Sequence, residues 1–504
     1  MTLPDWLDPL YDAAEMRAAD AWAIEEQGVP SLDLMERAGL GLAHVTAAAA
    51  RPGPVRVVVG RGNNGGDGLV VARLLREDGY EVDVLAPAAL EGLRGAALAN
   101  LERLPGPGPE PFAPDRLEKS GVVVDALLGT GFEGAPREPL ASAIAAINAQ
   151  DAPVVACDVP SGVDASTGEV EAEAVRAAAT ATFHGPKLGL YVNPGKEHAG
   201  RVEAIEIGIP RGAPGAGRAG LTAERVLDLY PRRAASGSKF VSGVLVVVGG
   251  SIGLTGAPTM AARSAQRAGA GYVQVAVPAP AQPAVDLRLL EQMSRGLPDA
   301  DGFHTPAGVA VVEEMAERAG AVVLGPGLGR DEGAQEFARG VAGAVTAPLL
   351  VDADGLNAHA GRLELFAERE APTVLTPHEG ELGRLLDRPS EEVAKHRLAS
   401  AREAAERSGA VVLLKGDDTI VALPGGEVAV NRAGSPALAT AGTGDVLSGL
   451  IGALLAKRLG AFEAACLGAL AHALAADAAA ARVGVDHVIA GDVIDALPYG
   501  LTLR

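Results

Sequence analysis

Short apolar runs alternate along the chain with longer segments whose apolar residues recur at helical spacing. Ten of these runs are rich in Val and Leu and lead into Gly, Pro, Asp or Lys: VRVVV, EVDVLA, GVVVDALLG, APVVACDVP, GVLVVVGG, GYVQVAVP, AVVLGPG, PLLVDAD, PTVLTP and AVVLLKG. Runs that are apolar on both faces are typical of parallel strands covered by helices. The pattern therefore predicts an α/β protein with its chemistry at the carboxyl ends of parallel strands.

One segment breaks this alternation. Residues 211–220, RGAPGAGRAG, have no apolar period and consist mostly of Gly, Ala and Pro, which predicts a linker. A chain of 504 residues is also too long for a single core. We therefore expect two α/β domains, residues 1–215 with a doubly wound, Rossmann-like sheet and residues 222–504 with a second sheet.

The composition narrows the classes of partner. Lys and Arg number 43 against 64 Asp and Glu, so the net charge of -21 argues against binding to nucleic acid or to an anionic membrane. The two cysteines, Cys157 and Cys466, fit a reducing compartment, and we expect a cytoplasmic protein. No signal peptide is predicted from the acidic N-terminal segment, and the apolar stretch 465–481 is interrupted by His472 and Asp477, so no membrane span is predicted either.

The segment GRGNNGGDG, residues 60–68, follows the first apolar run. It fits the G-x-G-x-x-G pattern of dinucleotide-binding folds and is predicted to be a loop before a helix that begins at Leu69. Asp67 has the place of a helix N-cap. The pattern does not explain Asn63 and Asn64, and the second strand lacks the acidic residue that binds a ribose in simple NAD-dependent dehydrogenases.

Other strand ends in the first half also carry polar groups. Asp125 closes one strand, Asp158 and Ser161 follow the next, and Lys187 lies in a Gly/Pro-rich turn. Asn64, Asp125 and Ser161 offer hard oxygen ligands at neighbouring strand ends, which suits a hard cation. Asp158 and Lys187 are a potential acid–base pair whose two roles the residues do not separate.

The motifs GxGNNGGDG, VDALLGTG, DVPSGVDA and KLGL are present in this order, and with them nearly the whole first half resembles the YjeF N-terminal domain family, the NAD(P)H-hydrate epimerases. The resemblance implies a potassium ion on Asn64, Asp125 and Ser161. It also implies contacts with a hydrated nicotinamide nucleotide from Asn63, Asn64, Gly65, Gly66, Asp67, Gly129, Thr130, Gly131, Phe132, Glu133, Gly134, Ala135 and Asp158.

In the second half, Gly442–Asp445 (GTGD) precedes a segment of helical period. The amides of Gly442–Gly444 then lie at a helix N-terminus, which is an anion site, and Asp445 is placed to act as a general base in phosphoryl transfer. The alternative is that Asp445 is only an N-cap. Further clusters follow other strands, namely Gly249–Gly250, Gly325–Arg330, Val351–Asn357, Thr376–Leu382 and Lys415–Thr419.

The motifs KGxxT, TPHxGE, DADxLN and ATAGTGDVLSG make residues 222–504 similar to the ADP/ATP-dependent NAD(P)H-hydrate dehydratases of the ribokinase-like superfamily. Two departures are GSPA at Gly434–Ala437, where GNPG is expected, and a less complete basic motif near Lys239. The resemblance implies nucleotide contacts from Lys415, Gly416, Asp417, Asp418, Thr419 and Gly444. It implies hydrate contacts from Ala257, Gly327, His378 and Asp445.

Together the halves suggest a metabolite-repair enzyme that epimerises R and S hydrates of NADH and NADPH and dehydrates the S form. The expected donor is ADP, giving AMP and phosphate, although the sequence leaves ADP and ATP open. Magnesium is expected with the nucleotide, and candidates to hold its waters are Asp352, Asp354, Glu379 and Glu381. We expect small-molecule nucleotide partners and a homo-oligomer. The alternative function is a vitamin or sugar kinase with a non-catalytic N-terminal binding module.

Overall fold

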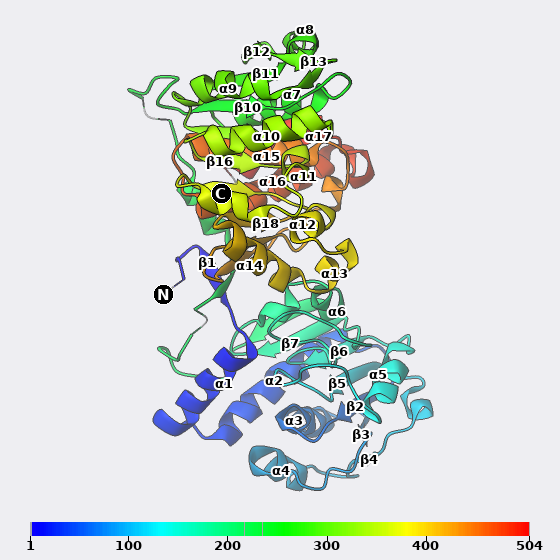
Figure 1. Ribbon diagram of the computed structural model, residues 1–504. Coiled ribbons are helices and arrows are strands. Elements are labelled where there is room, and N and C mark those ends of the chain that lie inside the picture. Colours follow the sequence, from blue (N-terminus) through cyan, green and yellow to red (C-terminus); the bar gives the residue numbers. More distant parts are fainter. Residues whose placement is uncertain (1–2, 216, 234, 503–504) are drawn as a thin grey trace. The chain divides into compact units, whose positions relative to one another are not determined.

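The computed structural model describes residues 3–215, 217–233 and 235–502 (Figure 1). The chain divides into two compact units. One contains Pro9–Gly220, and the other contains Pro4–Asp8 together with the chain from Leu221 onward. Both units are α/β, so the predicted fold class is confirmed. The N-terminal residues Pro4–Asp8 depart from the expected division, because they belong to the second unit.

The first unit has a seven-stranded parallel sheet in the order β4-β3-β2-β5-β6-β7-β8. Its strands are β2 (Val55–Val59), β3 (Val82–Ala86), β4 (Glu110–Pro111), β5 (Val122–Ala126), β6 (Val154–Cys157), β7 (Ala179–Phe183) and β8 (Arg201–Ile205). Its α-helices are α1 (Ala13–Ala21), α2 (Ser31–Ala49), α3 (Asn63–Glu77), α4 (Gly95–Glu102), α5 (Leu140–Asn148) and α6 (Gly195–Ala199).

Both faces of this sheet are buried. In β2, Val57 packs with α2 and α3 on one face, whereas Val58 packs with α5 on the other. In β5, Val122 and Val124 belong to the first cluster and Val123 to the second. Successive side chains of a strand point to opposite faces, so an unbroken apolar run is what a doubly covered sheet requires. The expectation of a doubly wound first domain agrees with this arrangement.

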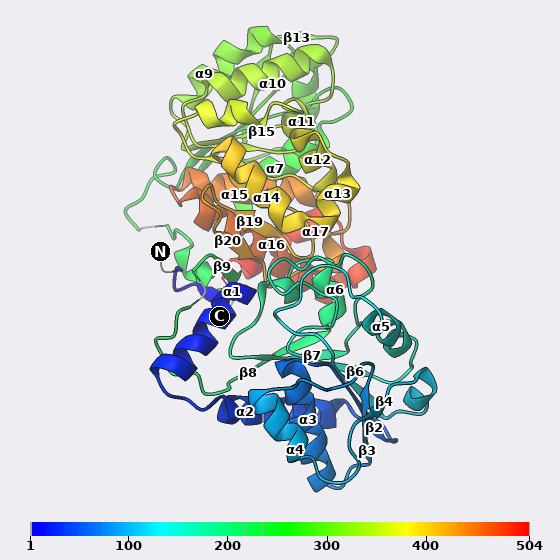
Figure 2. The ribbon, with the colours of Figure 1, turned by 60° about the horizontal axis from the view of Figure 1, so that its bottom comes forward.

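The second unit has an eleven-stranded sheet in the order β1-β9-β20-β19-β18-β17-β16-β15-β10-β11-β12 and a small hairpin, β13-β14. The strands are β1 (Leu7–Leu10), β9 (Ala219–Thr222), β10 (Val244–Val248), β11 (Tyr272–Pro278), β12 (Met293–Leu297), β13 (Asp299–Ala300), β14 (Phe303–His304), β15 (Ala321–Leu324), β16 (Leu349–Val351), β17 (Thr373–Leu375), β18 (Val411–Leu414), β19 (Ile420–Ala422) and β20 (Val428–Val430). Helices flank its sheet (Figures 1 and 2).

The α-helices of the second unit are α7 (Gly256–Arg267), α8 (Gln282–Asp286), α9 (Val309–Ala316), α10 (Glu332–Ala344), α11 (Asp354–Asn357), α12 (Glu379–Leu386), α13 (Ser390–Lys395), α14 (Arg397–Ser408), α15 (Thr443–Ala456), α16 (Ala461–Val483) and α17 (Ala490–Gly500). Strands β10 and β15–β18 pair in parallel. Their carboxyl ends therefore share one edge of the sheet, where the sequence motifs follow. Strands β19 and β20 add to β18 in antiparallel pairing.

The predicted linker is partly ordered. Its last residues enter β9, which pairs in the second sheet, so residues 219–220 are strand rather than linker. Ala216, within the same segment, lies outside the described residues. An isolated Gly/Ala sequence does not reveal that a neighbouring sheet edge will pair with it, which is why the pattern missed this strand.

Helix α16 is, within the described part of the chain, the one helix long and apolar enough to cross a membrane by length and composition. Most of it, 72% of its apolar window, is buried inside the protein. It packs against α15, α17 and the strands β17–β19. A helix that is apolar on nearly all sides is typical of the centre of a large core, and α16 has that place here.

Candidate active sites

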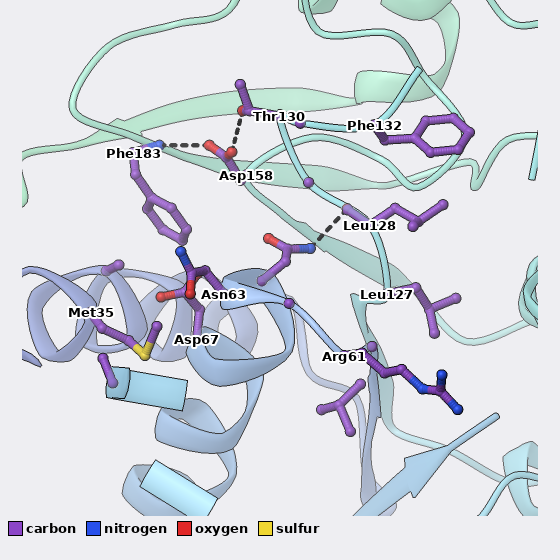
Figure 3. A pocket seen from close by; sticks show the side chains of 18 of the residues that line it. Met35, Arg61, Asn63, Asp67, Leu127, Leu128, Thr130, Phe132, Asp158 and Phe183 are labelled. Carbon is purple, nitrogen blue, oxygen red and sulfur yellow. Dashed lines mark hydrogen bonds between the residues drawn. The ribbon is translucent and has the colours of Figure 1, made fainter. Parts of the chain in front are cut away.

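The first unit contains a cavity of about 1380 Å³ at the carboxyl ends of β2, β5 and β6. The order of the sheet reverses here, and ligands of doubly wound folds bind at such points. In Figure 3, Asn63 and Asp67 lie across the cavity from Asp158 and Thr130. The predicted residues that line it are Asn63, Asn64, Asp67, Gly129, Thr130, Gly131, Phe132, Glu133, Asp158 and Lys187. The predicted residues outside the lining are Gly65, Gly66, Gly134 and Ala135.

The glycine-rich segment becomes helical earlier than expected. Helix α3 begins at Asn63 with Gly62 as its N-cap, so Asp67 lies in the second turn and is not an N-cap. A Cβ at Gly65 would come within 2.0 Å of the Gly60 carbonyl oxygen, and one at Gly68 within 2.7 Å of the Ala126 Cβ. Close packing of α3 on β2 and β5 thus outweighs the poor helix propensity of glycine.

We expect Gly65→Ala to destabilise the first unit by about 1–3 kcal/mol, because the added methyl group must displace backbone. Gly62→Ala is a matched control in the same loop, since nothing lies within 4 Å of its added Cβ. Chemical unfolding of both variants measures the difference. Equal stability would show that the close approach of α3 to Gly60 is not required.

Asp158 and Lys187 form a buried ion pair in the cavity wall. Lys187 Nζ lies 2.6 Å from Asp158 Oδ1 and donates to the Phe183 carbonyl at 2.7 Å, and its side chain is 1% exposed. The Thr130 hydroxyl donates to the other carboxylate oxygen of Asp158. Burial would raise the pKa of Asp158, but the Lys187 charge and these hydrogen bonds outweigh it and lower the pKa. Asp158 also has a φ of 65°, a strained conformation of the kind found at functional sites.

Two more carboxyl groups face this pair. Burial raises the pKa of Asp67 well above its usual range, and the nearby charges of Asp158 and Asp20 raise it further. Burial likewise raises the pKa of Asp20, which lines the cavity from α1. Asp67, Asp20 and Asp158 thus bring three carboxyl groups together around Lys187. Asp20 was missed by the sequence reasoning because nothing in its ordinary helical surroundings, AAEMRAADA, marks it.

Two of the three predicted potassium ligands, Asn64 and Ser161, contact the peptide groups of Leu128, and Asp125 joins them through Ser161. Asn64 Nδ2 donates to the Leu128 carbonyl at 2.8 Å, and the Leu128 N–H donates to Ser161 Oγ at 2.9 Å. Ser161 donates through its N–H and its hydroxyl to Asp125 at 2.8 and 2.6 Å. Asp125 is fully buried, and burial raises its pKa to about 6. No Lys, Arg or His within the described ranges ion-pairs with Asp125, so a bound cation fits the chemistry of this set.

The second site lies at the shared strand edge of the other sheet. Helix α15 begins at Thr443, and its N-cap is Gly442 with a φ of 90°. Asp445 is the third residue of the helix, and its side chain makes no N-cap hydrogen bond. The alternative that Asp445 serves as an N-cap is therefore wrong. The first amides of α15 remain available to an anion.

The environment of Asp445 suits a general base. Burial raises its pKa to about 7, with a further rise from the charge of Asp352 that the Lys415 charge opposes. Lys415 lies beside the same helix start, with its Nζ 3.8 Å from the position of a Cβ on Gly444. A carboxyl group with a pKa near neutrality can accept and return a proton at neutral pH.

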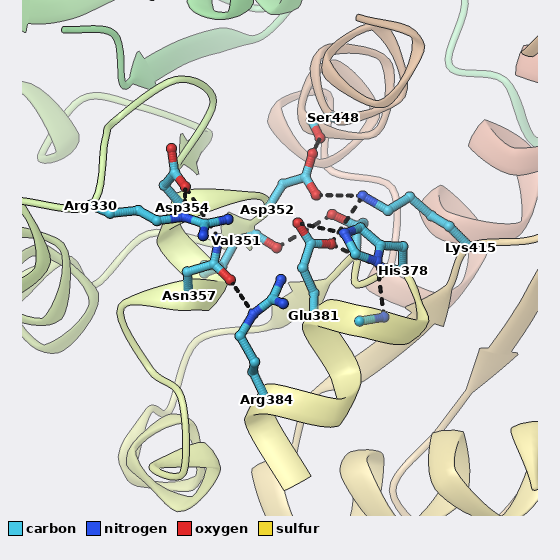
Figure 4. A network of polar contacts seen from close by, with 12 residues as sticks. Arg330, Val351, Asp352, Asp354, Asn357, His378, Glu381, Arg384, Lys415 and Ser448 are labelled. Carbon is cyan, nitrogen blue, oxygen red and sulfur yellow. Dashed lines mark hydrogen bonds and ion pairs between the residues drawn. The ribbon is translucent and has the colours of Figure 1, made fainter. Parts of the chain in front are cut away.

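Lys415 is held by two acidic side chains. Its Nζ lies 2.8 Å from Asp352 Oδ1 and 3.5 Å from Glu381 Oε2, and the Ser448 hydroxyl donates to Asp352 Oδ2 at 2.6 Å (Figure 4). Burial would lower the pKa of Lys415, but the charges of Asp352 and Glu381 raise it overall. Lys415 therefore stays charged next to the anion site. Ser448, from VLSG, is a positioning residue that the sequence reasoning missed.

The predicted hydrate residues come from three elements around this centre. His378 caps α12. Its ring Nδ1 accepts a hydrogen bond from the Gly380 N–H at 3.0 Å, and its backbone N–H donates to Glu381 Oε2 at 2.9 Å. The His378 side chain is half exposed. A Cβ on Gly327, which has a φ of 66°, would lie 3.1 Å from the Ala257 Cβ, so these two residues adjoin. Lys415 links His378 to the Asp445 region through Glu381.

Not every side chain of the predicted nucleotide segment Lys415–Thr419 is free to contact a nucleotide. Asp418 is fully buried, and Arg397 Nε donates to it at 2.9 Å while Arg397 also pairs with Glu379. The Asp418 carboxylate is thus engaged, and a nucleotide contact at Asp418 would come from its backbone. Gly434 of GSPA packs on this turn, since a Cβ there would lie 2.6 Å from the Asp417 carbonyl oxygen.

The four acidic candidates for magnesium all have partners. Asp352 binds Lys415 and Ser448, and Glu381 binds Lys415 and the His378 N–H. Asp354 and Glu379 pair with arginines, and no cluster of three His, Cys, Asp or Glu suited to a metal is found within residues 3–215, 217–233 and 235–502. Each of the four carboxylates is thus paired, and their part in holding the waters of a nucleotide-bound magnesium ion stays a prediction, so no step of the reaction is assigned to it.

Comparisons with known proteins cover both units. Residues 31–189 match the family model described as YjeF-related protein N-terminus, and residues 245–499 match that of NAD(P)H-hydrate dehydratase. A bifunctional NAD(P)H-hydrate repair enzyme of Moorella thermoacetica is 41% identical over 98% of this chain and 96% of its own length. The enzyme of the same name from Salinibacter ruber is 41% identical over 97% of this chain and 95% of its own length.

Among solved structures, the ADP/ATP-dependent NAD(P)H-hydrate dehydratase of Bacillus subtilis, co-crystallised with ATP and Mg²⁺, is 29% identical. It covers 55% of this chain and 95% of its own, with a TM-score of 0.48. The matches in sequence span both units and their motifs. The chain belongs to the family of bifunctional NAD(P)H-hydrate repair enzymes.

Proposed function

We propose that the chain restores hydrated NADH and NADPH in two steps. The first unit interconverts the R and S hydrates, and the second removes water from the S hydrate with ADP as donor, giving AMP and phosphate. The observation that carries the proposal is that each strand edge holds its own proton-transfer group, Asp158 with Lys187 in one unit and Asp445 in the other. The comparisons support repair over the alternative of a vitamin or sugar kinase, because they match both halves.

In the epimerase site, Asp158 and Lys187 are placed to move protons at C6 of the hydrated ring, where the configuration must be lost and regained. Asn63 and Asp67 line the cavity and can hold polar groups of the nucleotide. Asn64, Asp125 and Ser161 would hold potassium, which would supply a positive charge to the site of the anionic nucleotide. The acid and base roles within the pair stay open.

In the dehydratase site, the oxygen of the C6 hydroxyl attacks the terminal phosphorus of ADP, and Asp445 takes the proton of that hydroxyl. The bond from that phosphorus to the bridging oxygen breaks, and AMP leaves. The amides of Gly442–Gly444 and the charge of Lys415 stabilise the phosphoryl group in transfer. Phosphate then departs from C6 with its electron pair, the ring loses a proton from C5, and NADH or NADPH is regenerated.

Mixed R and S NADH hydrate tests the whole proposal. With ADP and magnesium, the purified chain is expected to convert all of the hydrate to NADH, followed by its absorbance. Without ADP, it should exchange R and S forms only. Conversion that stops when the S form is used up would reject the proposed epimerase activity. Absence of AMP among the products would reject ADP as the phosphoryl donor.

We expect Asp125→Asn to abolish stimulation of epimerisation by potassium and to weaken hydrate binding. The variant keeps the shape of the carboxyl group but removes the buried charge that a cation would balance. Rates with potassium chloride are compared with rates in a salt of a large organic cation. Epimerisation by Asp125→Asn at the wild-type rate in the absence of potassium would reject the cation assignment.

We also place the enzyme in the cytoplasm, because both cysteines, Cys157 and Cys466, are free and buried. Assembly into a homo-oligomer stays a prediction. Sedimentation of the purified chain tests it directly.

A further inference from the structure

We propose that Arg330 and Arg384 form a clamp for a phosphate group of the hydrated dinucleotide at the dehydratase site. The phosphate is either the pyrophosphate bridge or the 2′-phosphate of the NADPH form, and both share the same chemistry. The inference deepens the proposed function and rests on it. The sequence analysis named neither arginine as a ligand, although Arg330 ends the Gly325–Arg330 cluster.

The DADGLN segment holds both guanidinium groups by one edge each (Figure 4). Arg330 Nε lies 3.4 Å from Asp354 Oδ1, and Arg384 Nε donates to Asn357 Oδ1 at 2.7 Å. Asn357 Nδ2 in turn donates to Asp354 Oδ1 at 3.2 Å, and Gly329 N–H donates to Asp354 Oδ2 at 3.0 Å. The four side chains are therefore one connected row that sets the two arginines on a common frame.

This frame leaves most guanidinium donors available. Only the Nε of each arginine is used, and the Nη groups of Arg330 and Arg384 form no hydrogen bond or ion pair with any residue that the structure describes. The Arg330 side chain is 69% exposed. Two planar donor groups with free N–H edges match the oxygens of a phosphate, which arginine binds in a bidentate manner.

Arg330 and Arg384 also differ from the other cations of this site in how far acidic side chains balance their charge. Lys415 is neutralised by Asp352 and Arg397 by Asp418. The arginine pair, in contrast, carries two positive charges against the single carboxylate of Asp354, because the partner of Arg384 is a neutral amide. In a chain of net charge -21, an anionic substrate needs such a local excess of positive charge.

Neighbouring residues indicate that the ligand is the hydrate rather than ADP. Arg330 ends the loop that contains Gly327, and Arg384 lies on α12, which His378 caps. A Cβ on Gly380 would lie 3.7 Å from Arg384 Nη1 and 2.9 Å from the His378 ring, so the guanidinium lies next to His378. Gly327 and His378 are among the proposed hydrate contacts, whereas the proposed ADP contacts are on other segments, Lys415–Thr419 after β18 and Gly444 in α15.

Steady-state dehydration by the full chain tests the clamp with pure S hydrates of NADH and NADPH, ADP and magnesium. Arg330→Gln and Arg384→Gln are each expected to raise KM for the hydrate roughly tenfold to a hundredfold, the effect of losing a charge-assisted hydrogen bond. kcat and the KM for ADP should change by less than about threefold. Added salt screens charge interactions, so it should raise the KM of the wild-type protein for the hydrate more than the KM of a variant that carries both Arg330→Gln and Arg384→Gln.

Arg267→Gln is the matched control, because Arg267 is 55% exposed, pairs with Asp495 at 3.5 Å and lies at the far end of α7 from Ala257. It should behave as wild type. Equal losses for both hydrates assign the pyrophosphate, and a loss for the NADPH hydrate alone assigns the 2′-phosphate. If the arginine variants keep the wild-type KM for the hydrate, or raise only the KM for ADP, the clamp is overturned. The proposed function is still upheld in that case, provided that the wild-type protein dehydrates the hydrate. Wild-type protein that does not dehydrate the hydrate overturns both.

Discussion

Asp445→Asn is expected to lower dehydration of the S hydrate by about 10²-fold to 10⁴-fold, because the amide cannot take the proton of the C6 hydroxyl. The KM for ADP should change little, since Lys415 and the amides of α15 remain in place. Epimerisation of the R hydrate should be unchanged. NADH recovery with ADP and R-to-S exchange without ADP, measured on one preparation, give both numbers.

The pH dependence of the wild-type enzyme gives an independent check. A base must be ionised to accept a proton, and burial raises the pKa of Asp445 to about 7. kcat/KM for dehydration should therefore fall as pH decreases below about 7, approaching tenfold per pH unit, and level off above it. A profile that stays flat down to about pH 5 would contradict Asp445 as the base.

The matched control for Asp445 is Asp492→Asn. Asp492 is also the third residue of a helix, α17, and accepts a hydrogen bond from the Ile489 N–H at 3.0 Å. It makes the capping contact that Asp445 lacks. Dehydration retained in Asp445→Asn would reduce that residue to a structural one, and parallel loss of both activities would point to a misfolded variant.

The second large effect is expected in the other unit. Asp158→Asn should lower epimerisation by about 10²-fold to 10⁴-fold and leave dehydration of pure S hydrate unchanged. The variant also leaves Lys187, 1% exposed, without its carboxylate partner. Breaking one side of a buried ion pair typically costs about 3–5 kcal/mol, so the Tm of the first unit should fall as well.

A double variant separates these two consequences. Asp158→Asn with Lys187→Met removes both charges, which should recover much of the stability but none of the epimerisation. Asp164→Asn is the control in the same segment, since Asp164 accepts from Ser166 and Thr167 N–H groups and does not line the cavity. Epimerisation by the double variant at more than about a tenth of the wild-type rate would remove both residues from the chemistry.

Local patterns were sufficient for a contiguous part of each sheet, β3-β2-β5-β6 in the first and β18-β17-β16-β15-β10-β11 in the second, but not for the strands outside these parts. All ten apolar runs form strands, because a short, mostly apolar run bounded by Gly, Pro, Asp or Lys has few other stable arrangements. The order of the motifs was also sufficient to place Asp125, Asp158, Lys415 and Asp445 at strand or helix ends. In parallel sheets such ends meet at one edge, so proximity followed from the element type alone.

Other features depended on contacts between distant residues. A glycine-rich segment has no strong local preference, and α3 starts at Asn63 only because β2 and β5 accept glycines at close range. The N-terminal residues Pro4–Asp8 joined the second unit because an open sheet edge was there to pair. Neither event leaves a periodic signal in the sequence.

The sequence by itself thus determined the fold class and the family and predicted two centres of chemistry, because these depend on short motifs and on the period of apolar residues. The tertiary structure decided which charges remain free. Asp418 was expected to contact nucleotide, but Arg397 engages its carboxylate, while Arg330 and Arg384 keep unused donors on the DADGLN frame. Charge pairing depends on distances of a few ångströms between residues far apart in the chain, which spacing along the sequence does not encode.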